Sequence, residues 1–190
     1  MQETTSPYAT FAQRAYARLI DNALVSVPLT LLMLISLIYV RSLPIAMFFL
    51  LVEAAYKPLM ESNKGWTFGK KLMKIKVVDQ ETGALMNLNQ SLTRYIPWAL
   101  MFFTSVFVYT RYFQDPLFAE VVDPETFMEF VPKHVLSDNF LVSLISNLSV
   151  FSAVWMFGDP LVRALHDRIA GTIVVRDLEA VEKAENVGWE

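Results

Sequence analysis

Four stretches of mostly apolar residues alternate with polar segments along the chain, and each approaches the length of a membrane-spanning helix. They run at about 19–40, 44–59, 96–112 and 140–157. A helix that crosses about 30 Å of hydrocarbon needs roughly 20 mostly apolar residues. Pro28 lies inside the first stretch and indicates a kink there. We therefore expect an all-α membrane protein with four transmembrane helices.

Two segments outside these stretches predict smaller elements. Trp66–Val78 mixes lysines with apolar side chains, which is typical of a short amphipathic helix at a membrane surface. Asp79–Gly83 carries turn residues and predicts a short β-hairpin. Thr172–Val175 is rich in β-branched residues, and we expect it to pair with Ile75–Val78.

A C-terminal helix is predicted from Asp159, a favourable N-cap, to about Ala170. In such a helix Arg163 lies one turn from Asp159 and one turn from Asp167, so it could form an ion pair with either. Asp167 would then fall in the last turn, where the helix dipole disfavours a carboxylate. We therefore expect Asp167 to have a cationic partner, either Arg14 or a bound ion.

Composition supports a membrane protein and excludes several classes of site. The chain has 190 residues, of which 54% are hydrophobic and 18% are charged, whereas soluble domains carry about 25% charged residues. There is no cysteine and there are two histidines, so disulfides and zinc–thiolate sites are excluded. We expect no metal, no cofactor, no nucleic-acid partner and no enzymatic activity.

The distribution of charge predicts the orientation in the membrane. Lysines and arginines gather between the second and third stretches and near both termini, whereas the loop 113–138 is strongly acidic. The positive-inside rule then predicts a multi-pass protein of the inner (plasma) membrane with both termini in the cytoplasm. Loop 113–138 is extracytoplasmic in this arrangement, and the acidic tail 177–190 is cytoplasmic. Four lysines are predicted to contact anionic lipid headgroups of the bilayer: Lys70, Lys71, Lys74 and Lys76.

Three segments, in their order along the chain, resemble motifs of the RDD family of small bacterial membrane proteins. These segments are Gln13–Asp21, Gly65–Asp79 and Leu165–Val175. The family is named for one arginine and two aspartates, which match Arg14, Asp21 and Asp167, and Arg94 matches a further frequent position. The resemblance spans roughly residues 11–176 and implies a single membrane domain over residues 1–176.

The resemblance implies two functions. Some family members are reported as sodium/proton antiporters. The resemblance therefore implies exchange of a monovalent cation for a proton at Arg14, Asp21 and Asp167. So few spans leave little room for an enclosed pathway, so we expect a homodimer if the protein is a transporter. Others are accessory or assembly partners, which implies a scaffold that binds another membrane protein. Glu53, deep in the second stretch, is either a protonatable carboxyl for transport or a neutral acid hydrogen-bonded to the fourth stretch.

The position of Arg14 relative to the two aspartates leaves a structural alternative. Arg14 and Asp21 are seven residues apart, which is about 10 Å along a helix and too far for a direct ion pair. Either Asp21 exchanges a proton for a cation while Arg14 tunes its pKa, or Arg14 braces Asp167. Arg94, Arg163 and Asp159 are further candidates for structural ion pairs.

Overall fold

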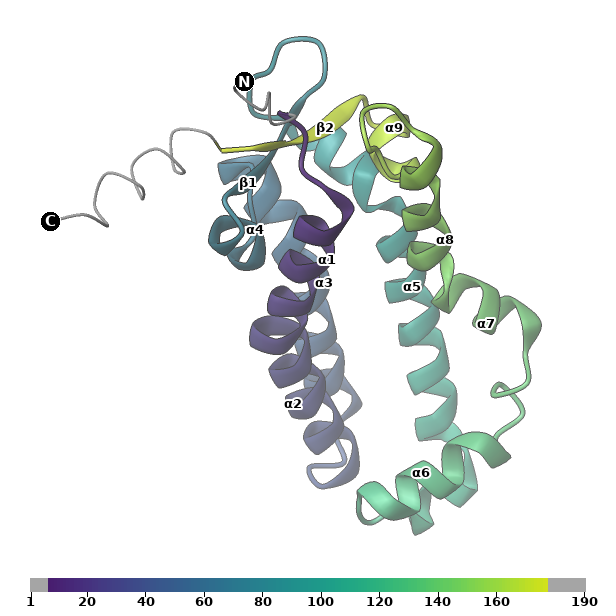
Figure 1. Cartoon of the computed structure of the whole chain (residues 1–190). Helices are drawn as coiled ribbons and strands as arrows, with labels where there is room; N and C mark the ends of the chain where they lie inside the picture. Colours follow the sequence, from purple (N-terminus) through teal and green to yellow (C-terminus); the bar gives the residue numbers. More distant parts are fainter. Residues whose placement is uncertain (1–6, 178–190) are drawn as a thin grey trace, which may run out of the picture. The chain divides into compact units, whose positions relative to one another are not determined.

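The computed structural model describes residues 7–177. The acidic tail predicted for residues 177–190 lies outside the described residues except for Asp177. The described chain is mostly helical with a small two-stranded sheet (Figure 1). It divides into two compact units. The first comprises Met1–Leu24, Lys57–Tyr95 and Ser152–Glu190, and the second comprises Val25–Tyr56 and Ile96–Phe151.

The first long helical run begins at a capping box. Thr10 Oγ1 accepts a hydrogen bond from the Gln13 backbone N–H at 3.2 Å, and the Gln13 side chain accepts one from the Thr10 N–H at 3.0 Å. Helix α1 (Phe11–Asp21) continues through a π-helical turn (Asn22–Ser26) into α2 (Val27–Ile38). Pro28 therefore does not end the helix. Its ring conflicts with the carbonyl of the residue four positions earlier, which lies within the π-helical turn.

The membrane-spanning candidates number fewer than the four predicted. Among the described residues, Phe11–Ile38 and α3 (Leu43–Lys64) are long and apolar enough to cross a membrane. A third candidate is the pair formed by α7 (Phe140–Ser146) with α8 (Leu148–Val154) and its 3-10 extension Trp155–Gly158, which is bent by 49°. Helix α5 (Leu88–Gln114) contains the predicted span 96–112 but is not among these candidates.

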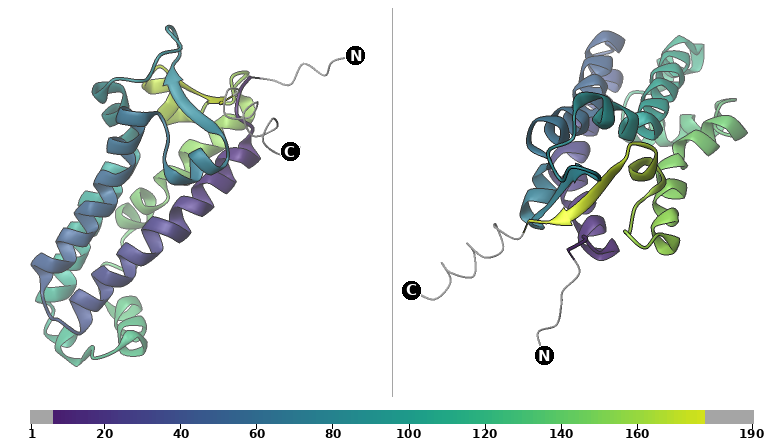
Figure 2. Two further views of the ribbon diagram at one scale, coloured as in Figure 1. Left: turned by 90° about the vertical axis from the view of Figure 1, so that its left-hand side faces the viewer. Right: turned by 90° about the horizontal axis from the view of Figure 1, so that it is seen from above.

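The predicted amphipathic segment is divided between two elements of the first unit. Helix α4 (Phe68–Leu72) is followed by strand β1 (Ile75–Asp79). Strand β1 pairs antiparallel with β2 (Thr172–Arg176), with Val77 opposite Val174, which confirms the pairing expected from the sequence (Figure 2). The predicted hairpin after β1 is reduced to one isolated bridge, between Val78 and Leu85.

Each unit has its own apolar core. In the first unit α1 packs against α4, α4 contacts β1, and the short helix α9 (Leu165–Ile169) contacts β2. The buried residues of its core cluster are Ala9, Ala17, Ile75, Val77, Met86 and Val174. In the second unit, α2, α3 and α5 contribute to a core with the 3-10 turn η2 (Pro116–Glu120) and α6 (Pro124–Lys133). That core comprises Met33, Leu37, Ile38, Ala46, Tyr112, Phe118, Val121 and Phe130.

The predicted C-terminal helix from Asp159 is wrong in its extent. Residues 159–164 form turns and irregular backbone, and helix α9 begins only at Leu165. The Asp159 carboxylate accepts hydrogen bonds from the backbone N–H of Leu161 at 2.9 Å and of Arg163 at 3.3 Å. It thus closes a local turn in place of the first helical turn that an N-cap would start. Arg163 and Asp167 therefore do not share a helix.

Candidate functional site

Asp167 lies at the centre of a buried charge cluster in the first unit. Its side chain is fully buried and forms ion pairs with Arg14 and, at 2.8 Å, with Arg94. The predicted contact between Arg14 and Asp167 is therefore confirmed. Asp167 sits in the first turn of α9, not the last, and accepts the Ala164 backbone N–H at 3.1 Å. The expected conflict with the helix dipole does not arise, because acidic groups are favourable at a helix start.

Arg14 links helix α1 to the distant segment that contains Val162 and Asp167. It extends from α1, pairs with Asp167, and donates from Nη1 to the Val162 carbonyl at 2.7 Å. Val162 has a backbone φ of 53°, a conformation that costs energy for a β-branched residue. The Arg14 guanidinium therefore binds both the loop before α9, at the Val162 carbonyl, and the Asp167 carboxylate within α9.

A second carboxylate in the cluster, Glu61, was not identified from the sequence. Glu61 is 1% exposed; it pairs with Lys70 and lies 3.8 Å from the Arg94 Nε. The charge of Arg94 is thus shared between Glu61 and Asp167. The predicted headgroup role does not suit Lys70, whose side chain is 12% exposed and faces Glu61.

Asp21 anchors helix α4 to helix α1. Its carboxylate accepts a hydrogen bond from the Thr67 hydroxyl at 2.5 Å and another from the Gly69 backbone N–H at 2.7 Å. Asp21 is 7% exposed, so burial strengthens both contacts. The segment around Gly69 thus uses a backbone donor to hold an internal carboxylate.

The two arginines determine the protonation of Asp167. Burial alone would raise the pKa of the Asp167 carboxyl, but Arg94 and Arg14 hold that pKa well below its usual value. The carboxylate therefore stays ionised across the physiological pH range. Such a group is suited to bracing and does not readily take up a proton near neutral pH.

A serine and a histidine also contact the cluster. Ser152 Oγ lies 2.7 Å from His166 Nδ1, and His166 Nε2 lies 3.3 Å from the Asp167 carboxylate. His166 therefore contacts the carboxylate of its neighbour in sequence. Ser152 is 2% exposed, and its oxygen also accepts the His166 backbone N–H at 3.2 Å. The arrangement positions a buried histidine and offers no accessible nucleophile.

Acidification should weaken the fold through His166. Burial is the largest cause that lowers the pKa of His166 well below its usual value of 6.5. As the pH falls below 6.5 the unfolded chain takes up a proton that the folded chain refuses, so stability declines by about 1.4 kcal/mol per pH unit. Chemical denaturation in detergent micelles between pH 7 and pH 5 measures this slope. The variant His166→Asn should have a shallower slope; an equal slope in both proteins would contradict the assignment.

The remaining predicted residues lie outside this cluster. Asp159 and Arg163 form the expected ion pair at 2.8 Å, and Arg163 also donates to Gln80 at 2.7 Å. Lys76 lies 3.5 Å from Asp177. Glu53 belongs to the second unit, where it is half-buried and makes no hydrogen bond or ion pair with the described residues.

Lysines around Trp66 form a cationic surface beside α4. The ammonium groups of Lys64 and Lys71 lie 5.2 Å and 4.7 Å from the centre of the Trp66 ring, within the range of cation–π attraction. Lys71 is exposed and Lys74 is half-buried. Their contact with anionic headgroups stays a prediction. Among residues 7–177, no group of three or more His, Asp or Glu side chains is arranged to hold a metal ion.

Comparison with known proteins identifies the chain at the level of its family. The sequence model of the RDD family matches residues 8–171. That range contains Arg14, Asp21 and Asp167, together with Glu61 and Arg94 of the buried cluster. No curated protein and no solved structure matches the chain. The chain therefore belongs to the RDD family, a family of small membrane proteins.

Proposed function

We propose that this membrane protein is a non-catalytic scaffold or accessory subunit that binds a membrane-protein partner. The observation that carries the proposal is that protein donors already occupy both family aspartates. Asp167 is bound by two arginines, and Asp21 is bound by the Thr67 hydroxyl and the Gly69 N–H. A transported cation would have to displace these donors, at the cost of leaving buried charges unpaired.

Loop 113–138 is the surface that suits such a partner. It folds with its own buried aromatic residue, Phe130, and yet exposes Met128 by 76% and Val135 by 83%. Exposed apolar side chains beside acidic ones are typical of interaction sites. In the proposed topology the chain crosses the membrane several times, both termini are cytoplasmic and this loop is outside. The support for this topology is the concentration of lysine and arginine in the other loop and near the termini.

Co-purification tests the proposal. We expect cross-linking in native membranes to capture one partner in a fixed ratio with the full chain. The double variant Met128→Glu and Val135→Glu should lose that partner, because a charge at each exposed position opposes burial in an interface. Leu85→Glu is the matched control, since Leu85 is 51% exposed but lies in the first unit. A partner retained by the double variant, or lost equally in the control, would contradict the role of the loop.

Proton-coupled transport of a monovalent cation is the second candidate, and Glu53 favours it. An acid without an ion pair in an apolar helix such as α3 is a functional candidate by default. If the scaffold proposal is right, the purified protein in vesicles should show no sodium-driven proton movement above protein-free vesicles. Movement that Glu53→Gln abolishes would instead establish the transport function.

A further inference from the structure

The second unit contains a half-open cavity of about 520 Å³, lined by residues of η2 and α6 and the segments that flank them. Its apolar lining residues are Leu117, Val121, Phe130 and Val135. Pockets that hold small organic ligands have volumes of roughly 300–1,000 Å³ and are mostly apolar with a few polar groups. The cavity has the size and the apolar floor of such a pocket.

The charged residues of the lining make the cavity negative. Asp115, Glu120 and Glu129 contribute carboxylates, and Lys133 contributes the ammonium group. Lys133 lies 3.6 Å from Glu129, and both side chains are mostly exposed. That pair leaves Asp115 and Glu120 without a neutralising lysine or arginine in the lining.

His134, which directly follows α6, also lines the cavity. Its Nδ1 accepts the Leu136 backbone N–H at 3.2 Å. Nε2 faces the Asp115 carboxylate at 3.5 Å. The other oxygen of the Asp115 carboxylate accepts the Leu117 backbone N–H at 2.9 Å, so Asp115 is held in place at the edge of the cavity.

Hydrogen bonds hold the walls of the cavity in place. The Arg41 guanidinium donates to the carbonyls of Phe118 at 2.9 Å and Ala119 at 3.3 Å, and also to the carbonyl of Val121. At the start of α6, the Asp123 carboxylate accepts the Thr126 backbone N–H at 2.8 Å. A wall fixed in this way loses little entropy when a ligand binds.

We propose that this cavity binds a small organic cation, a primary ammonium group carried on a short aromatic or aliphatic body. The ammonium meets the carboxylates of Asp115 and Glu120, while the apolar body covers Leu117 and Val135, the two apolar lining residues that the protein leaves exposed. Burial of these side chains favours an organic body over a hydrated inorganic ion. The inference is independent of the proposed scaffold function, because it concerns a free ligand.

The test uses the full chain in nanodiscs and the probe 4-fluorobenzylammonium, followed by ¹⁹F NMR. Saturable binding is expected beyond that of protein-free nanodiscs. The neutral 4-fluorobenzyl alcohol, which keeps the ring, should bind at least about tenfold more weakly because it lacks the charge-assisted hydrogen bonds. Glu120→Gln should weaken binding of the ammonium probe by about fivefold or more, and its side chain is exposed, so the fold should be retained.

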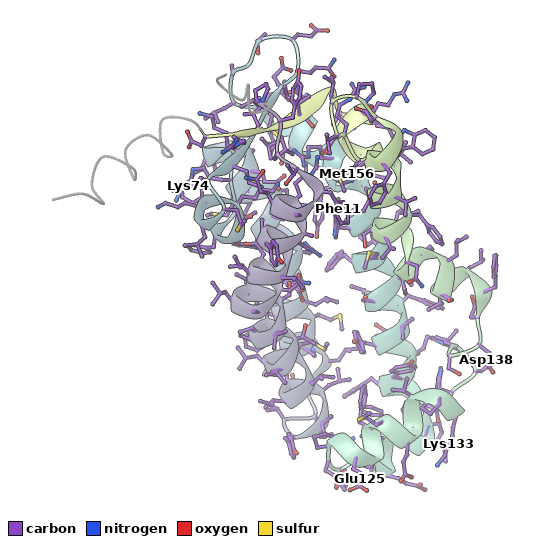
Figure 3. The ribbon with its side chains drawn as sticks, viewed as in Figure 1. Phe11, Lys74, Glu125, Lys133, Asp138 and Met156 are labelled. Carbon is purple, nitrogen blue, oxygen red and sulfur yellow. The ribbon has the colours of Figure 1, made fainter. Side chains whose placement is uncertain are left out.

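Glu125→Gln is the matched control. It removes the same charge from the start of α6, whereas Lys133 of the cavity lies at the end of that helix (Figure 3). Glu125 is exposed and does not line the cavity, so binding should change by less than about twofold. Three results would overturn the proposal: no saturable binding of the ammonium probe, equal affinity for the alcohol, or equal weakening by Glu125→Gln and Glu120→Gln.

Discussion

Replacing Asp167 with alanine should destabilise the first unit by about 3–5 kcal/mol, because it leaves buried arginines without their carboxylate. The Arg94 side chain is 2% exposed and the Arg14 side chain 11% exposed, so water cannot replace the lost partner for Arg94. The Ala164 N–H would also lose its acceptor. Chemical denaturation of the full chain in detergent micelles at neutral pH measures the change in the free energy of unfolding.

An exposed ion pair provides the control for this change. Glu129 and Lys133 are 3.6 Å apart, and their side chains are 65% and 71% exposed. Glu129→Ala should therefore change the free energy of unfolding by only about 0.5 kcal/mol. If Asp167→Ala costs no more than Glu129→Ala, the buried cluster is not a stabilising brace.

A double variant separates the loss of an interaction from the cost of an isolated charge. Arg94→Met in the Asp167→Ala background removes the buried cation that the first substitution leaves unpaired. Glu61 keeps its contact with Lys70 in this variant. Replacing both members of a buried pair with apolar groups is often far less costly than removing one. We therefore expect the double variant to be more stable than Asp167→Ala alone.

The sequence predicted the contacts whose partners carry strong and separate signals. The sequence predicts that Asp167 needs a cationic partner and leaves Arg14 and a bound ion as the two candidates; the structure shows Arg14. The pairing of Ile75–Val78 with Thr172–Val175 was likewise predictable, because both segments are β-branched. In both cases the residue types themselves, a carboxylate that needs a cation and two β-branched segments, limit the number of possible partners.

Glu61 could not be predicted because the boundary of its helix was misplaced. The apolar pattern predicts that the second stretch ends near Leu59. Helix α3 instead includes Pro58 and continues to Lys64. The Pro58 carbonyl accepts a hydrogen bond from the Ser91 hydroxyl at 2.8 Å, a tertiary contact that no local pattern reveals. The apolar pattern alone therefore places Glu61 in the loop that follows the helix, whereas the structure places it within α3.

The fourth stretch also differs from its prediction as a single helix, for a related reason. Its hydrophobicity is continuous enough to predict one helix over 140–157, yet the structure divides it at Asn147. The Asn147 side chain donates to the Ser143 carbonyl at 2.8 Å. Such local hydrogen bonds compete with regular helix geometry. Composition reports how apolar a segment is and does not report where the backbone changes direction.

Gly69 marks the closest approach between helices α1 and α4. A Cβ atom added at Gly69 would lie 1.9 Å from the Ala17 carbonyl oxygen and 3.0 Å from the Asp21 Cγ. The nearer distance is far below any van der Waals contact, and the obstructing atom belongs to backbone, which cannot rotate away. Helix α4 would have to move away from α1, and this movement would break the 2.7 Å hydrogen bond from the Gly69 N–H to Asp21.

Gly69→Ala should therefore destabilise the protein by about 3 kcal/mol, the upper part of the range for overpacked sites. The higher helix propensity of alanine offsets at most about 1 kcal/mol of this loss. Gly158→Ala is the matched control, because a Cβ there meets no heavy atom within 4 Å; it should be neutral or stabilising by up to about 1 kcal/mol. Denaturation of both variants under identical conditions measures the difference. Equal stability of the two variants would contradict the close packing of Gly69 against the Ala17 carbonyl. It would also mean that the hydrogen bond from the Gly69 N–H to Asp21 contributes little to stability.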